Sequence, residues 1–149
     1  MPKSVFVFAS NLRGRHGKGA ALVAARDWGA REGLGEGVCG NSYALPTKNS
    51  RLETLTLNEI ERFVERFLRY SERNPEEKFL LTAIGCGLAG YTPLDIAPMF
   101  KGAKDQQNLF FPESFLGILG LDNTRMSFDN RNELAQQHAG ARENLTGML

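Results

Sequence analysis

Cysteine, histidine and tryptophan are all scarce in this chain of 149 residues, which contains two cysteines, two histidines and one tryptophan. Cys39 and Cys86 alone cannot build a disulfide framework, and no group of cysteines and histidines has the spacing of zinc ligands. We therefore expect neither a metal site nor a bound cofactor.

The chain also lacks an excess of charge of one sign and a long hydrophobic run. Its 18 basic and 17 acidic residues leave a formal net charge of +1, whereas proteins that coat nucleic acids usually carry a large basic excess. No apolar stretch approaches the ~20 residues of a membrane span, and the opening Met-Pro-Lys is not typical of a signal peptide. We expect a cytoplasmic protein with no membrane partner.

Apolar residues at 42% and charged residues at 23% are typical of a folded soluble protein. The charge is uneven, because residues 1–48 hold seven basic and three acidic side chains, a local charge of +4. Within that part, Arg13, Arg15 and Lys18 stand among glycines, where backbone amides are also accessible. This combination favours a small anionic ligand.

Short apolar runs predict strands that alternate with helices. The run Val5–Ala9 has no polar break, as expected of a strand buried on both faces, and the alanine-rich segment 20–25 predicts a helix. Further strands are expected at 42–45, ending before Pro46, at 79–84 and at 108–112. The pattern predicts an α/β fold of three layers, α/β/α, with a mixed and mostly parallel sheet.

Capping signals locate the helix ends. The glycines of segment 33–37 are expected to close the first helix and form a turn. Thr56 and Glu59 have the spacing of a capping box, and Thr92 is placed to cap a third helix that begins with Pro93. The apolar stripe of the middle helix is expected to consist of Ile60, Phe63, Val64, Phe67 and Leu68.

We divide the chain into a nucleotide-binding domain, residues 1–115, and a C-terminal appendix, residues 116–149. The appendix is expected to be partly helical, because segment 130–143 has only a thin apolar stripe.

Two glycine-rich segments, 14–19 and 85–91, each follow an expected buried strand and precede an expected helix. In open α/β sheets, ligands bind at the carboxyl ends of strands, where such loops meet. Glycine allows close backbone approach to a phosphate, and a helix start offers unpaired N–H groups. The first segment fits neither the Walker A motif nor the dinucleotide fingerprint. A pair of such loops would suit a diphosphate.

Several stretches of the chain resemble macro domains, the ADP-ribose-binding fold. Ser10-Asn11 followed by a glycine loop and an alanine-rich helix resembles the family's opening, and segment 84–91, Ile-Gly-Cys-Gly-Leu-Ala-Gly-Tyr, resembles its second loop. These stretches, together with segment 42–48, are most similar to phage and bacterial macro-like proteins of undetermined function. The resemblance covers roughly residues 4–115, and for a phage protein it implies the cytoplasm of the bacterial host.

The resemblance also implies ligand positions. Asn11 would lie beside a distal ribose, Gly17, Lys18 and Gly19 would form the ribose-side loop, and the second loop would surround the diphosphate. The full set expected to bind ligand is Ser10, Asn11, Arg13, Gly17, Lys18, Gly19, Gly85, Cys86, Gly87, Leu88, Ala89, Gly90 and Tyr91. Macro domains usually hold the adenine amino group with an Asp before the first strand, where this chain has Lys3-Ser4.

Three functional classes remain open from the sequence. We expect a protein that binds a small nucleotide with an ADP-ribose-like diphosphate, as a reader or a sequestering protein such as a phage counter-defence factor. A hydrolase of an ADP-ribosyl or terminal phosphate bond is the alternative, with Asn11 orienting water and His16 as a general base. A nucleic-acid- or protein-binding module is a third hypothesis, and we do not favour it.

The same residues also have structural interpretations. Asn11 is a common turn former, and His16 could equally be an ordinary loop histidine. We interpret Cys86 as a small packing residue rather than a nucleophile, although a thiol at a helix start could have a lowered pKa.

Overall fold

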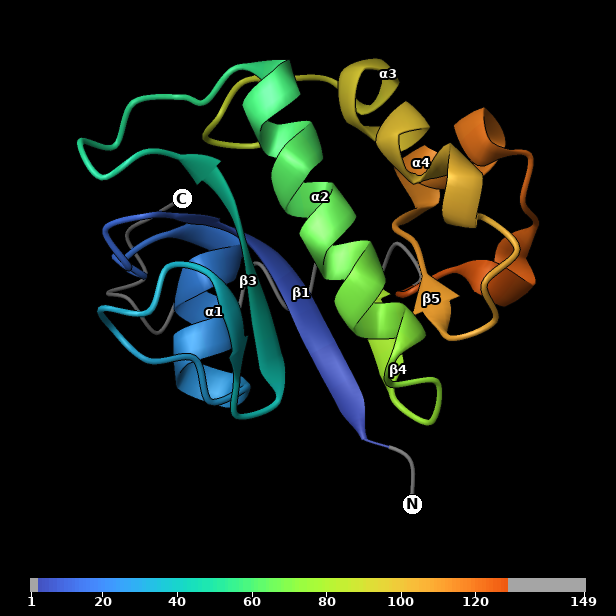
Figure 1. Ribbon diagram of the computed structural model, residues 1–149, viewed down its shortest axis with the longest axis horizontal. Helices are drawn as coiled ribbons and strands as arrows, with labels where there is room; N and C mark the ends of the chain where they lie inside the picture. The colour runs from blue at the N-terminus through green and yellow to red at the C-terminus, as the bar shows by residue number, and fades with distance from the viewer. Residues whose placement is uncertain (1–2, 129–149) are drawn as a thin grey trace.

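The apolar runs of the sequence form the strands of one five-stranded sheet. In the computed structural model, which describes residues 3–128, the strand order is β2-β3-β1-β4-β5. The strands are β1 (Ser4–Asn11), β2 (Gly37–Cys39), β3 (Ser42–Lys48), β4 (Lys78–Leu81) and β5 (Leu109–Phe110). β1 pairs in parallel with β3 and β4, and β4 with β5, whereas β2 is antiparallel to β3. The predicted mixed, mostly parallel sheet is confirmed (Figure 1).

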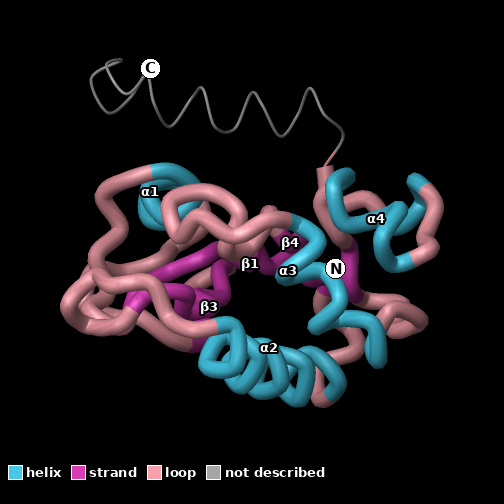
Figure 2. The backbone as a smooth tube through the Cα atoms, turned by 90° about the horizontal axis from the view of Figure 1, so that it is seen from above, coloured by secondary structure: helices cyan, strands magenta, loops and turns pink. Residues whose placement is uncertain are grey.

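Helices cover both faces of this sheet. α1 (Gly19–Asp27) lies on one face and α2 (Leu57–Glu72) on the other, as Figure 2 shows. α3 (Pro93–Ile96) and α4 (Glu113–Leu119) follow later in the chain, with 3₁₀ segments at Ala97–Ala103 and Asn123–Arg125. The three-layer α/β/α architecture predicted from the sequence is therefore confirmed. Within residues 3–128, no helix combines the length and apolarity needed to cross a membrane.

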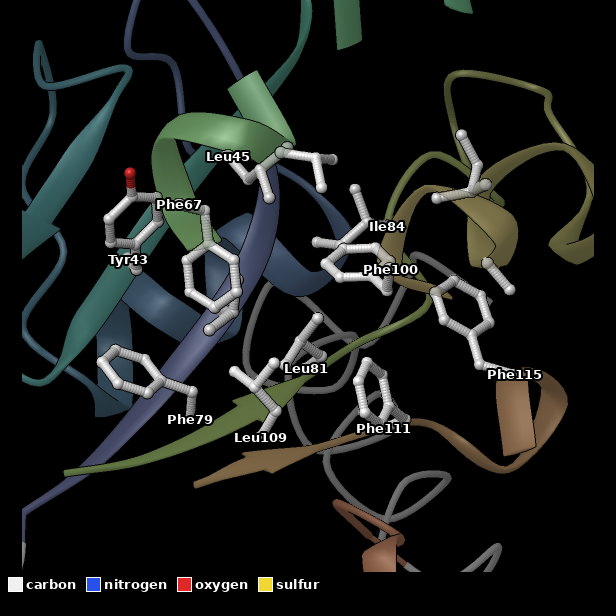
Figure 3. Packing of buried hydrophobic residues seen from close by; sticks show 14 of the residues in the cluster. Tyr43, Leu45, Phe67, Phe79, Leu81, Ile84, Phe100, Leu109, Phe111 and Phe115 are labelled. Carbon is white, nitrogen blue, oxygen red and sulfur yellow. The ribbon is translucent and has the colours of Figure 1, made fainter. Parts of the chain in front are cut away.

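Alternation along β1 separates the interior into two cores, because successive strand residues point to opposite faces. Val5 and Val7 enter the larger core with α2, whereas Phe6 and Phe8 enter the smaller core with α1. The larger core is rich in aromatic rings (Figure 3), which include Tyr43, Phe67, Phe79, Phe100, Phe111 and Phe115. Both cores hold β1 rigidly, and its carboxyl end carries the first glycine loop.

Two expected element ends are wrong. β3 continues through Pro46 to Lys48. Proline is tolerated there because β2 pairs only as far as Ala44, so no strand needs an N–H on that edge. α1 ends at Asp27, and the glycines of segment 33–37 do not close it. They instead form a loop that crosses the chain near Gly14.

The predicted helix starts are confirmed. The Thr56 hydroxyl accepts a hydrogen bond from the Glu59 N–H, and the Glu59 carboxylate accepts one from the Thr56 N–H. The Thr56 N–H and the Thr56 hydroxyl both donate to the Glu59 carboxylate, and these two bonds lower the pKa of Glu59. Ile60, Val64 and Phe67 of the expected stripe are fully buried, and Phe63 and Leu68 pack at its edge. Thr92 and Asp95 form a second capping box ahead of α3.

The boundary that we placed between residues 115 and 116 lies within α4. Leu116 and Leu119 are buried in the larger core. Arg125 then binds back to the sheet end, because its guanidinium donates to the carbonyls of Lys104, Gln106 and Leu109. The chain as far as residue 128 thus packs onto the same body, while the expected helix at 130–143 lies outside the described residues.

Candidate functional site

A cleft of about 760 Å³ opens at the carboxyl ends of β1, β3 and β4, the edge at which α/β sheets bind ligands. Three connecting segments border it: the β1–α1 loop (residues 12–18), the β3–α2 loop (residues 49–56) and the β4–α3 loop (residues 82–92). The lining residues are Ala9, Ser10, Asn11, Arg15, Gly17, Lys18, Gly19, Ala20, Ala21, Thr47, Lys48, Leu52, Thr82, Ala83, Gly85, Cys86, Gly87, Leu88 and Ala89. Both glycine-rich loops therefore border one cleft.

The side chain of Asn11 folds the β1–α1 loop. Its Oδ1 accepts from the Arg15 N–H, and its Nδ2 donates to the Arg15 carbonyl, both at 3.0 Å. The Gly14 N–H donates to the Asn11 carbonyl at 2.9 Å. Asn11 thus lines the cleft but uses its amide mainly to close the loop, which is the turn-forming role of asparagine.

A second segment, residues 31–35, supports this loop from behind. The Gly33 N–H donates to the Gly14 carbonyl at 2.9 Å, and the Ser10 hydroxyl donates to the Gly35 carbonyl. The φ of Gly14 is +77°, and a Cβ there would lie 2.4 Å from the Gly33 carbonyl carbon. Only glycine allows the two backbones to cross at this distance.

His16 belongs to this support and not to the cleft. Its ring is 2% exposed, packs edge-on against Phe8 and lies with Nε2 3.1 Å from the Arg31 carbonyl. Since a carbonyl only accepts, Nε2 carries the proton in this bond. The His16 N–H donates to Glu32 Oε1 at 2.6 Å. The general-base role suggested by the sequence finds no support in this arrangement, because His16 is buried and is not among the described residues that line the cleft.

The end of the β1–α1 loop leaves backbone amides unpaired. In the part of the chain that the structure describes, the N–H groups of Gly17, Lys18, Gly19, Ala20 and Ala21 form no hydrogen bond. Lys18 occupies the N-cap of α1 without a side-chain cap. These amides and the positive end of the α1 dipole are thus available to an anion at the cleft.

The β4–α3 loop is held by its own backbone. Cys86 N–H donates to the Ala83 carbonyl, Gly90 N–H to Gly87 and Tyr91 N–H to Gly85, at 2.9–3.0 Å. The amides of Gly87, Leu88 and Ala89 form no hydrogen bond within residues 3–128. They lie at the cleft and resemble the anion-binding concavities that consecutive free amides produce.

The charge of the cleft is positive. Arg15, Lys18 and Lys48 line it, and no Asp or Glu is among the described lining residues. The described ion pairs, Arg26 with Asp27 and Arg66 with Glu36, involve none of these three cations. Lys48 is half-buried as a residue and takes part in neither of the described ion pairs. An anion in the cleft would compensate this charge.

The structure separates the predicted ligand residues into two groups. Ser10, Asn11 and the segments 17–19 and 85–89 line the cleft, whereas Arg13, Gly90 and Tyr91 do not. Arg13 is exposed elsewhere. The Tyr91 hydroxyl donates to the Leu55 carbonyl at 2.7 Å and fixes the β3–α2 loop.

Sequence reasoning named Arg15 as a cation favouring an anionic ligand but left it out of the expected ligand set, and it missed Thr47, Lys48 and Leu52 as lining residues. A usable signal existed for Thr47 and Lys48, because they follow a strand expected to end at the same sheet edge. No local pattern separates Arg15 from Arg13, and none indicates Leu52.

Cys86 lines the cleft but is a poor nucleophile. Burial, and to a lesser degree the nearby Asp95 carboxylate, raise the pKa of its thiol to about 11. The sulfur donates to the Ile84 carbonyl at 3.4 Å. The thiol is protonated at neutral pH, in agreement with our interpretation of Cys86 as a packing residue.

Within residues 3–128, no three His, Cys, Asp or Glu side chains gather in a way that could hold a metal ion. The chain matches no protein-family model, no curated protein and no solved structure. The site is therefore interpreted from its own geometry and chemistry.

Proposed function

We propose that the cleft binds a nucleotide through an ADP-ribose-like diphosphate and that the protein acts as a reader or a sequestering protein. The observation that carries this proposal is the meeting of two loops with unpaired amides at one cleft. Each loop can hold one phosphate by N–H donation. The two phosphates of a diphosphate are linked by one oxygen, so neighbouring amide clusters favour it over a monophosphate.

The cations of the cleft support the same ligand. Arg15 and Lys18 belong to the first loop, and Lys48 is the last residue of the neighbouring strand β3. A guanidinium can bind a phosphate through two N–H groups, whereas an ammonium acts as a point charge. Together they offset the charge of a diphosphate whose oxygens accept from the backbone.

Binding without hydrolysis fits the lining best. No carboxylate and no imidazole is among the described lining residues, and the Cys86 thiol is protonated at neutral pH. The cleft therefore offers no carboxylate, imidazole or thiolate as a general base among these side chains. The cleft can hold and orient a diphosphate, and its amides can do so without any change of protonation.

The test is calorimetric titration of the full chain with ADP-ribose, ADP and inorganic pyrophosphate. Gly87→Leu is the informative variant, because a Cβ at Gly87 meets nothing within 4 Å and its φ lies outside the left-handed region. The variant protein should therefore fold normally, and the added side chain should occupy part of the cleft. We expect it to weaken binding by at least about tenfold, equivalent to about 1.4 kcal/mol.

Gly102→Leu is the matched control, since Gly102 is equally open and lies outside the cleft. No heat with any ligand at millimolar concentration, or equal effects of both variants, contradicts the proposal. Chromatographic recovery of intact ADP-ribose after long incubation supports a reader, whereas released products identify a hydrolase. Binding of nucleic acid that weakens steeply with salt would indicate the third class.

A further inference from the structure

A tight turn holds Leu52 at the rim of the cleft. Asn49 Oδ1 accepts from the N–H groups of Arg51 and Glu53 at 2.9 and 3.0 Å. Backbone bonds join Asn49 N–H to the Glu53 carbonyl and Leu52 N–H to the Asn49 carbonyl. The position of Leu52 is thus determined by four hydrogen bonds that do not involve its side chain.

Leu52 has a backbone conformation that leucine rarely adopts. Its φ is +64°, and it is the one non-glycine residue with positive φ among residues 3–128. Side chains with a Cβ are disfavoured there, and turns with this conformation usually contain glycine or asparagine. The side chain of Leu52 is 40% exposed and lines the cleft. A leucine in this disfavoured conformation, with its side chain at the cleft, points to a role for the side chain there.

Leu88 supplies a second apolar side chain to the same cleft. It is 68% exposed and belongs to the β4–α3 loop. The Thr54 hydroxyl donates to the Ala89 carbonyl at 3.4 Å, which ties the loops of Leu52 and Leu88 together. Figure 1 shows the β3–α2 and β4–α3 loops side by side above β1 and β3.

We propose that Leu52 and Leu88 form an apolar subsite that packs against the nucleobase of the bound nucleotide. This inference rests on the proposed function, because the cations and free amides of the cleft fix the diphosphate beside the subsite. A flat, weakly hydrated ring is the part of a nucleotide that gains most from covering leucine side chains. The subsite gives affinity by contact area, and it should therefore accept several bases and favour purines over pyrimidines.

The subsite is tested by comparing a ligand with a base and one without. ADP, UDP and inorganic pyrophosphate are titrated calorimetrically into wild type, Leu52→Gly and Leu88→Ala. We expect each variant to weaken ADP binding about five- to tenfold, UDP binding less, and pyrophosphate binding less than about twofold. Leu52→Gly should fold well, since glycine adopts positive φ readily; circular dichroism and thermal unfolding verify this.

Leu94→Ala is the matched control, because Leu94 is 73% exposed on α3 and does not line the cleft. It should leave all three affinities unchanged. Equal losses for ADP and pyrophosphate, or no loss for ADP, overturn the subsite while the diphosphate function stands. Absence of binding of all three ligands to wild type rejects the proposed function and the subsite together.

Discussion

The two glycine-rich loops border one cleft but are stabilised in different ways. The β1–α1 loop is fixed by side chains and by segment 31–35, which lies far along the chain. The β4–α3 loop is folded mainly by hydrogen bonds among its own backbone groups. The first loop therefore depends on the rest of the molecule, and the second depends on its local turns.

Glycine has two different roles around the cleft, and the β1–α1 loop contains both. A Cβ at Gly14 would lie 2.4 Å from the backbone of Gly33, and one at Gly35 would lie 2.3 Å from the Asn11 carbonyl oxygen. At Gly17 and Gly87, in contrast, a Cβ would meet nothing within 4 Å. Some glycines permit close packing behind the site, and others leave space in front of it. Substitutions can separate these two roles.

The largest expected effect is that of Gly14→Ala. The methyl group would clash with backbone that cannot move aside cheaply, and the φ of +77° disfavours alanine. We expect the free energy of unfolding to fall by more than about 3 kcal/mol. Chemical denaturation measures the change.

Gly87→Ala is the counterpart in the second loop. Its backbone conformation and surroundings accept a methyl group, so stability should change by less than about 1 kcal/mol. Comparable losses in the two variants would contradict the distinction between the two roles of glycine.

For Asn11→Ala we expect a loss of stability that is smaller than that of Gly14→Ala. This change removes both hydrogen bonds to the Arg15 backbone, and because the loop is exposed, water replaces them in part. We expect a loss of about 1–2 kcal/mol in denaturation experiments. Diphosphate affinity should fall as well, because the ordering of the loop is then completed only on binding.

Asn11→Asp serves as the comparison for that variant. It retains an acceptor for the Arg15 N–H and loses the donor to the Arg15 carbonyl, so its stability should be intermediate. A fully stable Asn11→Ala would show that segment 31–35 alone holds the loop.

The smallest expected effect is the reaction of the Cys86 thiol with an alkylating reagent at neutral pH. Only the thiolate reacts with iodoacetamide, and a pKa raised to about 11 leaves little thiolate at about pH 8. Alkylation should therefore be slow near neutral pH and accelerate as the pH rises towards 11. Peptide mapping by mass spectrometry follows the reaction, with the unfolded chain as the fast reference. Rapid labelling at neutral pH would assign Cys86 a reactive role.

Local sequence patterns predicted the elements that depend on near neighbours. The buried strand around Val5–Phe8, the capping box of Thr56 and the two strand–glycine–helix units all have short-range signals, and all are present. The burial of His16 was not predictable, because it depends on contacts with Arg31 and Glu32 across a chain crossing.

Two of the lining residues, Lys48 and Leu52, were missed for different reasons. Lys48 reaches the cleft because β3 pairs beside β1 with a register shift at the end of the strand. Leu52 reaches it through a positive φ that its residue type disfavours. The position of Lys48 depends on strand pairing, whereas that of Leu52 depends on a local turn in which leucine replaces the residue types that such turns prefer.

The most direct test of the shared cleft is a ¹H–¹⁵N NMR titration of the full chain with inorganic pyrophosphate. If one diphosphate is held by both loops, the amides of Gly17 and Gly19 should shift together with those of Gly87 and Ala89, with one common dissociation constant. Shifts confined to one loop, or two different dissociation constants, would contradict the account.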